Sequence, residues 1–122
     1  MGALNPELFE NLIPVAANYK SSDWLLANTY LQSKLLENSS DPIVDARIHA
    51  MLTYRNPISL NKRFQNQNDG NSKKVISWLD FHGESLKKRF ELEAYKTMNK
   101  FLSSIDIETY SNKKIEDLIK DW

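Results

Sequence analysis

Residues 23–37 have the sequence DWLLANTYLQSKLLE, residues 38–41 have NSSD, and residues 42–55 have PIVDARIHAMLTYR. Apolar residues recur in both long segments at steps of three and four, which is typical of amphipathic helices. The predicted inward faces are Trp24, Ala27, Leu31 and Leu35 in the first helix, and Val44, Ile48, Met51 and Leu52 in the second. Because the loop between them is short, the two helices are predicted to form an antiparallel hairpin at the centre of the fold.

Three dipeptides mark helix starts in the first half of the chain, namely Asn5-Pro6, Asp41-Pro42 and Asn56-Pro57. An Asn or Asp side chain accepts hydrogen bonds from the free N–H groups of a first helical turn. Proline fits the first helical position, where its missing N–H has no partner to lose. The pattern predicts a first helix over residues 6–12, the helix over 42–55, and a short helix after Pro57.

The second half contains one long helical pattern, from residue 73 to residue 103. Its apolar stripe comprises Val75, Ile76, Leu79, Leu86, Phe90, Ala94, Met98, Phe101 and Ile105, and Gly83 is expected to bend it. A polar stretch over residues 65–71 is predicted to be a mobile loop, and a last short helix is predicted over residues 112–120. With no period-two alternation, the sequence predicts an all-α, compact bundle of five or six helices with short loops and no sheet.

Composition excludes several classes of protein. The chain has 122 residues, no Cys, and 16 basic against 16 acidic side chains, which predicts one helical domain without disulfides. Residues 1–122 are interpreted as a single domain, either complete or cut from a longer protein. No apolar run approaches the roughly 20 residues that cross a bilayer, so no membrane partner is expected and the predicted location is intracellular, cytoplasmic or nuclear.

Few residues suit catalysis or metal binding. Asp45 and His49 are four positions apart on a predicted helix and can face each other, whereas Asp80, His82 and Glu84 point in different directions unless Gly83 breaks the helix. With only three Gly residues, no phosphate-binding glycine loop is possible. The sequence therefore predicts no cofactor, no metal site and no enzymatic activity.

Two binding functions remain. The main prediction is a non-catalytic protein–protein interaction module that binds another protein or a second copy of itself, as a subunit, an adaptor or an inhibitor. Its expected contacts are Trp78, Phe81 and Leu92, rimmed by Lys74, Lys88 and Arg89, because aromatic residues and Arg are enriched at interface centres. The alternative is a nucleic-acid-binding domain that uses the basic stretch 62–100, through Lys62, Arg63, Lys73, Lys74, Lys87, Lys88 and Arg89.

Overall fold

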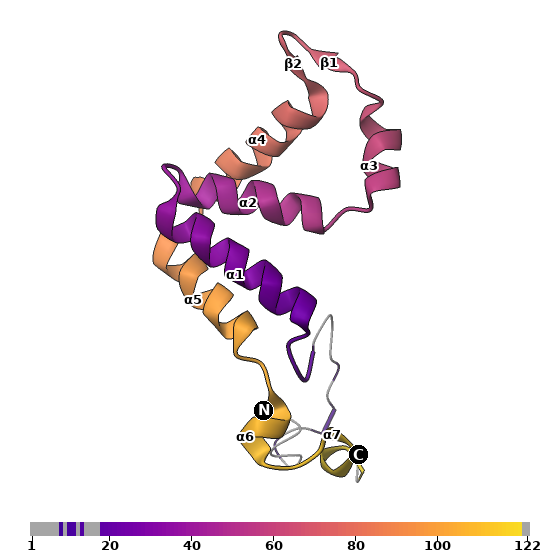
Figure 1. The fold of residues 1–122 in the computed structure, drawn as a ribbon, viewed down its shortest axis with the longest axis vertical. Coiled ribbons are helices and arrows are strands. Elements are labelled where there is room, and N and C mark those ends of the chain that lie inside the picture. Colours follow the sequence, from indigo (N-terminus) through magenta and orange to yellow (C-terminus); the bar gives the residue numbers. More distant parts are fainter. Residues whose placement is uncertain (1–7, 9, 12, 14–17, 121–122) are drawn as a thin grey trace.

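The computed structural model describes residues 8, 10–11, 13 and 18–120. The helix predicted over residues 6–12 lies mostly outside these residues. Within them the chain forms seven α-helices and one small hairpin (Figure 1): α1 Asp23–Asn38, α2 Pro42–Thr53, α3 Pro57–Phe64, β1 Asn68–Asp69, β2 Ser72–Lys73, α4 Lys74–Lys87, α5 Leu92–Ser103, α6 Ile107–Ser111 and α7 Ile115–Leu118. The mostly helical character is confirmed, whereas the prediction of no sheet is wrong.

Local capping explains where the central helices begin. The Ser22 hydroxyl accepts a hydrogen bond from Leu25 N at 3.2 Å, and the Asn56 side chain accepts one from Ile58 N at 2.8 Å. Helices α2 and α3 begin at Pro42 and Pro57, as the sequence predicts. Asp41 makes no cap bond with its side chain and instead pairs with Lys87 of α4 at 2.6 Å.

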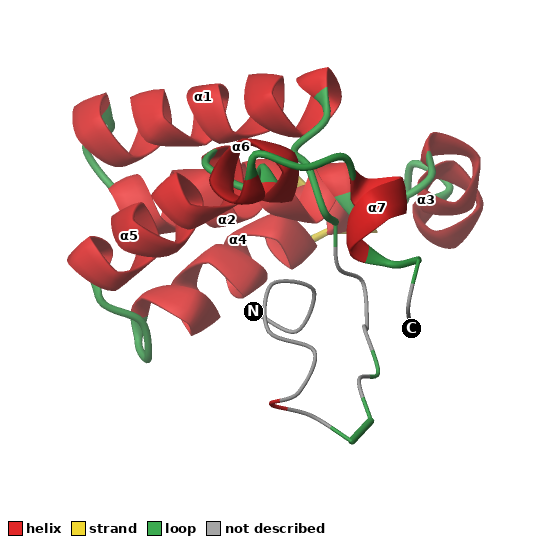
Figure 2. Cartoon of the chain, turned by 90° about the horizontal axis from the view of Figure 1, so that it is seen from below, coloured by secondary structure: helices red, strands yellow, loops and turns green. Residues whose placement is uncertain are grey.

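Four helices form the central packing unit. Helix α1 lies against both α2 and α5, and α2 also packs on α4. Helix α3 and the hairpin extend from one end of this unit, and α6 and α7 lie at the other end (Figures 1 and 2). The described part is therefore elongated, which corrects the prediction of a compact bundle.

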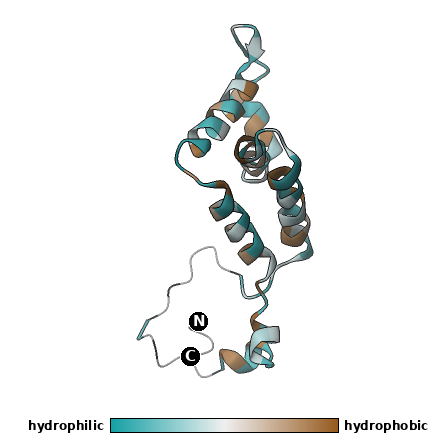
Figure 3. Cartoon of the chain, turned by 90° about the vertical axis from the view of Figure 1, so that its left-hand side faces the viewer, coloured by the Kyte–Doolittle hydropathy of each residue, from teal (hydrophilic) through white to brown (hydrophobic). Residues whose placement is uncertain are grey.

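Large apolar side chains remain exposed on several helices. Apolar segments are visible along helix surfaces in Figure 3, and the exposed residues include Trp24, Tyr30 and Leu31 of α1 and Met98 and Phe101 of α5. The predicted inward stripe of the last long helix is therefore partly wrong. The buried apolar core is small and comprises Leu36, Val44, Ala46, Ala50 and Met51.

The long helix predicted over residues 73–103 is two helices. Helix α4 continues through Gly83 and ends at Lys87. The chain then turns back, so that α5 packs on α1. Gly83 allows α2 to come close, because a Cβ atom at this position would lie 2.7 Å from Val44 Cγ1. The glycine therefore serves helix packing rather than a helix end.

The polar stretch 65–71 folds into more structure than a loop. Asn68 pairs with Lys73 and Asp69 with Ser72, and Gly70 turns the chain at a φ of +57°. The predicted mobility of this segment stays a prediction. Near the other terminus, the helix predicted over residues 112–120 is shortened to α7, because Asn112 adopts a left-handed conformation that ends α6.

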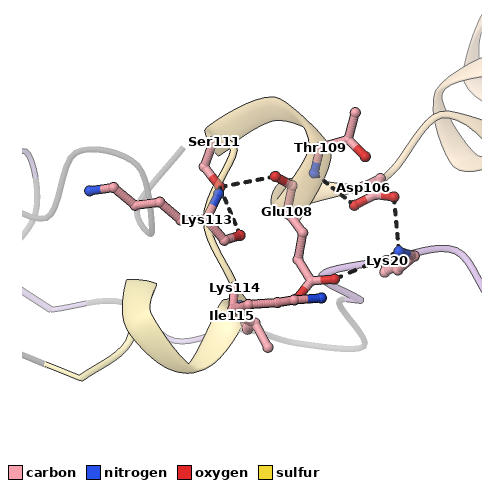
Figure 4. A network of polar contacts seen from close by, with 8 residues as sticks. All are labelled: Lys20, Asp106, Glu108, Thr109, Ser111, Lys113, Lys114 and Ile115. Atoms are coloured by element: carbon pink, nitrogen blue, oxygen red, sulfur yellow. Dashed lines mark hydrogen bonds and ion pairs between the residues drawn. The ribbon is translucent and has the colours of Figure 1, made fainter.

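A polar network ties the segment before α1 to the C-terminal helices (Figure 4). Lys20 Nζ lies 3.1 Å from Asp106 and 3.6 Å from Glu108, while Ser21 N donates to Ile105 O at 2.8 Å. The Asp106 side chain also accepts from Thr109 N at 3.1 Å and so caps α6. The backbone bond from Thr109, followed by that from Lys20, lowers the pKa of the Asp106 carboxyl.

In the part of the chain that the structure describes, no helix is long and apolar enough to cross a membrane. The intracellular location stays a prediction.

Candidate functional site

Helix α1 buries a different face from the predicted one. Thr29, Gln32 and Leu36 point inward, whereas Trp24, expected in the core, is 74% exposed. Side-chain bonds favour the observed orientation. Asn99 Nδ2 of α5 donates to Thr29 O at 2.8 Å and to Ser33 Oγ at 2.9 Å. The predicted stripe was wrong because polar side chains, and not only apolar ones, make the contacts of α1.

Gln32 is the most informative of these polar residues. It is only 8% exposed, and its Nε2 atom donates to Ala46 O at 2.9 Å and to His49 Nδ1 at 3.0 Å. Because the amide nitrogen of Gln32 can only donate, His49 Nδ1 is the acceptor in this contact. The Oε1 atom of Gln32 is buried without a hydrogen-bond partner among the described residues.

Arg47 of α2 brings an uncompensated charge to the same region. Its Nε atom is buried and has no hydrogen-bond partner among the described residues, and no carboxylate of that part lies within 4.0 Å of its guanidinium group. The guanidinium carbon lies 5.7 Å from the centre of the Tyr54 ring. Burying a charged donor without an acceptor is costly, so this arrangement favours an anionic ligand.

Both residues line one pocket of about 290 Å³ between α1, α2 and α5. Its polar lining includes Gln32, Arg47, His49, Tyr54, Tyr95 and Asn99. Burial and the neighbouring Tyr54 raise the pKa of the Tyr95 hydroxyl above its ordinary value, while Arg47 and Gln32 oppose this rise. Tyr95 is therefore a neutral hydroxyl at physiological pH and can donate or accept a hydrogen bond.

The arrangements considered from sequence for catalysis do not form among the described residues. His49 bonds Gln32, while Asp45 accepts a hydrogen bond from Ser39 Oγ, so these two residues do not act as a pair. His82 packs against Trp78 and Phe81. No group of three or more metal-ligating side chains gathers in the described part, and neither histidine there bonds a hydroxyl or carboxylate.

The predicted contact residues lie along α4, in the turn after it and at the start of α5. Trp78 is half-buried and packs on Phe64 with ring centres 5.4 Å apart, whereas Phe81 is 64% exposed and Leu92 is half-buried at the start of α5. Lys74 donates to Gln67 Oε1, and Lys88 and Arg89 are exposed at the end of α4. That these residues bind a partner protein or a second copy of the chain stays a prediction.

The basic residues suggested for nucleic acid are also dispersed. Lys62 and Arg63 lie on α3, Lys73 in the hairpin, and Lys87 at the end of α4, where it pairs with Asp41. They lie on three elements, namely α3, the hairpin and α4.

Comparison with known proteins points to an enzyme. No protein-family model matches the chain. The homoserine O-acetyltransferase of Cyclobacterium marinum is 31% identical over 116 residues, which cover 83% of this chain and 32% of that enzyme. Homoserine O-acetyltransferases of Trichormus variabilis and Chlorobium luteolum are 26% and 29% identical, over 85% and 87% of this chain. The chain spans about a third of the length of these relatives.

These similarities correct the functional prediction. They contradict a non-catalytic adaptor, subunit or inhibitor, the alternative of a nucleic-acid-binding domain, and the statement that no enzymatic activity is expected. The prediction of no enzymatic activity was wrong because it was based on catalytic motifs within short stretches of sequence. The relatives are about three times as long as the region they share with this chain, so local motifs in that region are a poor guide to the activity of the whole.

The sequence analysis also missed the pocket residues Gln32, Arg47, Tyr95 and Asn99. A usable signal was present in α1, where Leu25, Thr29, Gln32 and Leu36 follow helical spacing as regularly as the apolar stripe chosen instead. Two polar residues within an otherwise regular inward face indicate buried hydrogen bonds.

Proposed function

We propose that the chain supplies an amino-acid-binding pocket to an O-acyltransferase that acts on homoserine or on an α-amino acid of similar size. The observation that carries this proposal is a pocket lined by Gln32, Arg47 and Tyr95, in which the Arg47 guanidinium group has no carboxylate partner among the described residues. The similarity to homoserine O-acetyltransferases over most of the chain supplies the reaction class.

The side chains of Gln32 and Arg47 complement a zwitterion. The carboxylate of an α-amino acid accepts charge-assisted bonds from a guanidinium group, and its ammonium group donates to an amide oxygen. Tyr54, stacked against Arg47, limits where the guanidinium plane can lie.

The size of the pocket favours a small ligand. Its volume of about 290 Å³ lies near the lower end of the range usual for ligand pockets. In the proposed reaction the bond between the donor and its acyl group breaks, and an ester bond forms at the side-chain oxygen of the amino acid. The hydroxyl proton goes to the leaving group of the acyl donor. The role assigned to this pocket is to bind and orient the acceptor amino acid.

The test is acyl transfer to L-homoserine by the protein that carries this chain, followed by mass spectrometry of the ester. Arg47→Gln is expected to raise KM for homoserine roughly 10- to 100-fold, since a charge-assisted bond is worth about 1.5–3 kcal/mol. Arg89→Gln, which removes the same charge from an exposed side chain that does not line the pocket, is the matched control. Absence of the ester with wild-type protein, or an unchanged KM in Arg47→Gln, would contradict the proposal.

A further inference from the structure

A second cluster of arginines surrounds the ring of Trp78. Arg55, which follows α2, has its guanidinium carbon 5.7 Å from the centre of this ring, and Arg63 of α3 lies 5.5 Å from it. Trp78 belongs to α4, so three separate elements bring these side chains together. Neither arginine lines the amino-acid pocket.

Both positive charges are uncompensated among the described residues. No carboxylate there lies within 4.0 Å of Arg55 or Arg63, and no side-chain hydrogen bond there uses their N–H groups. Contact with an aromatic face holds a guanidinium group while leaving its N–H edge free to donate. Both arginine side chains are exposed, so their donors are accessible from solvent.

The pKa of His82 is affected by the same positive charges. Its ring lies 4.8 Å from that of Trp78, edge to face. Burial lowers the pKa of His82, and the positive charges of Arg47, Arg55 and Arg63 lower it further. Three arginines therefore act on one imidazole, and no acidic residue is among the groups that shift it.

We propose that Arg55, Arg63 and the ring of Trp78 form a binding site for the phosphate group of a small molecule. Two fixed guanidinium groups carry two positive charges, which match a phosphate dianion, and each can donate two parallel bonds to its oxygens. Trp78 positions both groups and so reduces the side-chain entropy lost on binding. This site goes beyond the proposed acyl transfer, because it is separate from the pocket for the acceptor amino acid.

The experiment is titration of the chain with inorganic pyrophosphate at low ionic strength, followed by calorimetry and by the NMR signal of the Trp78 indole N–H. The double variant Arg55→Gln/Arg63→Gln is expected to weaken binding at least 10-fold. Arg89→Gln, which removes an exposed arginine away from Trp78, is expected to bind like the wild type. Circular dichroism melting of each variant establishes that it is folded.

A second arm compares phosphate with carboxylate, using succinate as a dianion of similar charge. Binding of pyrophosphate that is lost in the double variant, kept in Arg89→Gln and at least 10-fold weaker for succinate supports the site. Three results would overturn it: no binding by folded wild-type chain, equal loss in Arg89→Gln, or equal affinity for succinate. Arg55→Lys keeps the charge without the planar fork and is expected to recover only part of the affinity.

Discussion

Helix α2 packs mainly on α4 and α1, and these two interfaces are built differently. Its contact with α4 is apolar and close, with Gly83 lying directly against Val44. Its contact with α1 contains buried polar groups, since Gln32 donates to Ala46 O and to His49. Asn99 of α5 extends this polar region by bonding Thr29 O and Ser33 Oγ.

The α2–α4 interface serves packing, whereas the α1–α2–α5 region forms the proposed binding pocket. At Gly83 and Val44 the α2–α4 contact is closely packed and leaves no space for a ligand. The α1–α2–α5 region leaves Gln32 Oε1 and Arg47 Nε without partners among the described residues. Buried orphan groups are rare in proteins and need an explanation, and the proposed amino-acid ligand of the adjoining pocket offers one.

The largest expected effect comes from filling the apolar interface. Gly83→Leu places a side chain where even a Cβ atom would lie 2.7 Å from Val44 Cγ1, so α2 and α4 must separate. Overpacking of this kind costs typically about 1–3 kcal/mol, and occasionally more, which thermal melting detects. Gly70→Ala is the control. A Cβ atom at Gly70 would have nothing within 4 Å, but the φ of +57° is strained for alanine, so this variant measures the backbone cost of losing a glycine alone. Equal stability of Gly83→Leu and wild type would show that this interface is not closely packed.

A second substitution sharpens the contrast at the polar interface. Gln32→Leu keeps the volume but removes the two bonds that Nε2 donates to Ala46 O and His49 Nδ1, so the free energy of unfolding is expected to fall by about 1–3 kcal/mol. Binding of L-homoserine is expected to weaken at least 10-fold. Urea titration and calorimetry measure the two effects separately. A large loss of stability with binding retained would mean that Gln32 serves packing alone.

The pH dependence of His82 tests the charge around α4. Because the pKa of His82 is lowered below its ordinary value of 6.5, the unfolded chain binds this proton more tightly than the folded chain. His82 is therefore expected to reduce stability as pH falls below about 6.5. NMR titration is expected to show the pKa below 6.5, moving upward in Arg55→Gln/Arg63→Gln. An unchanged His82 pKa in that variant would show that Arg55 and Arg63 do not lower it.

The smallest effect is expected at the exposed network of Figure 4. The pKa of Asp106 is lowered, so its stabilising bonds are present above its ordinary value of 3.8 and are lost as pH falls through the folded value. Asp106→Asn is expected to lower the melting temperature slightly at pH 7 and to match the wild type at strongly acidic pH. A difference that persists in acid would assign the effect to the cap geometry instead of the charge.

Local chemistry made part of the fold predictable. The Asp41-Pro42 and Asn56-Pro57 pairs mark the starts of α2 and α3, because proline and the preceding polar residue act within one turn. The inward face of α1 was not predictable from apolar spacing, since its orientation depends on Asn99, which is 70 residues from Thr29 in sequence. The pocket depends on the same long-range contacts, which periodicity within one helix does not contain.

The most direct test of the central claim is an NMR titration of this chain with L-homoserine, 3-aminopropan-1-ol and 4-hydroxybutanoate. The two analogues lack the carboxylate and the ammonium group respectively. We expect L-homoserine to shift the Arg47 Nε–H and Gln32 side-chain signals, and each analogue to bind at least 10-fold more weakly. Equal binding of all three compounds, or no shift with L-homoserine, would contradict an amino-acid site formed by Arg47 and Gln32.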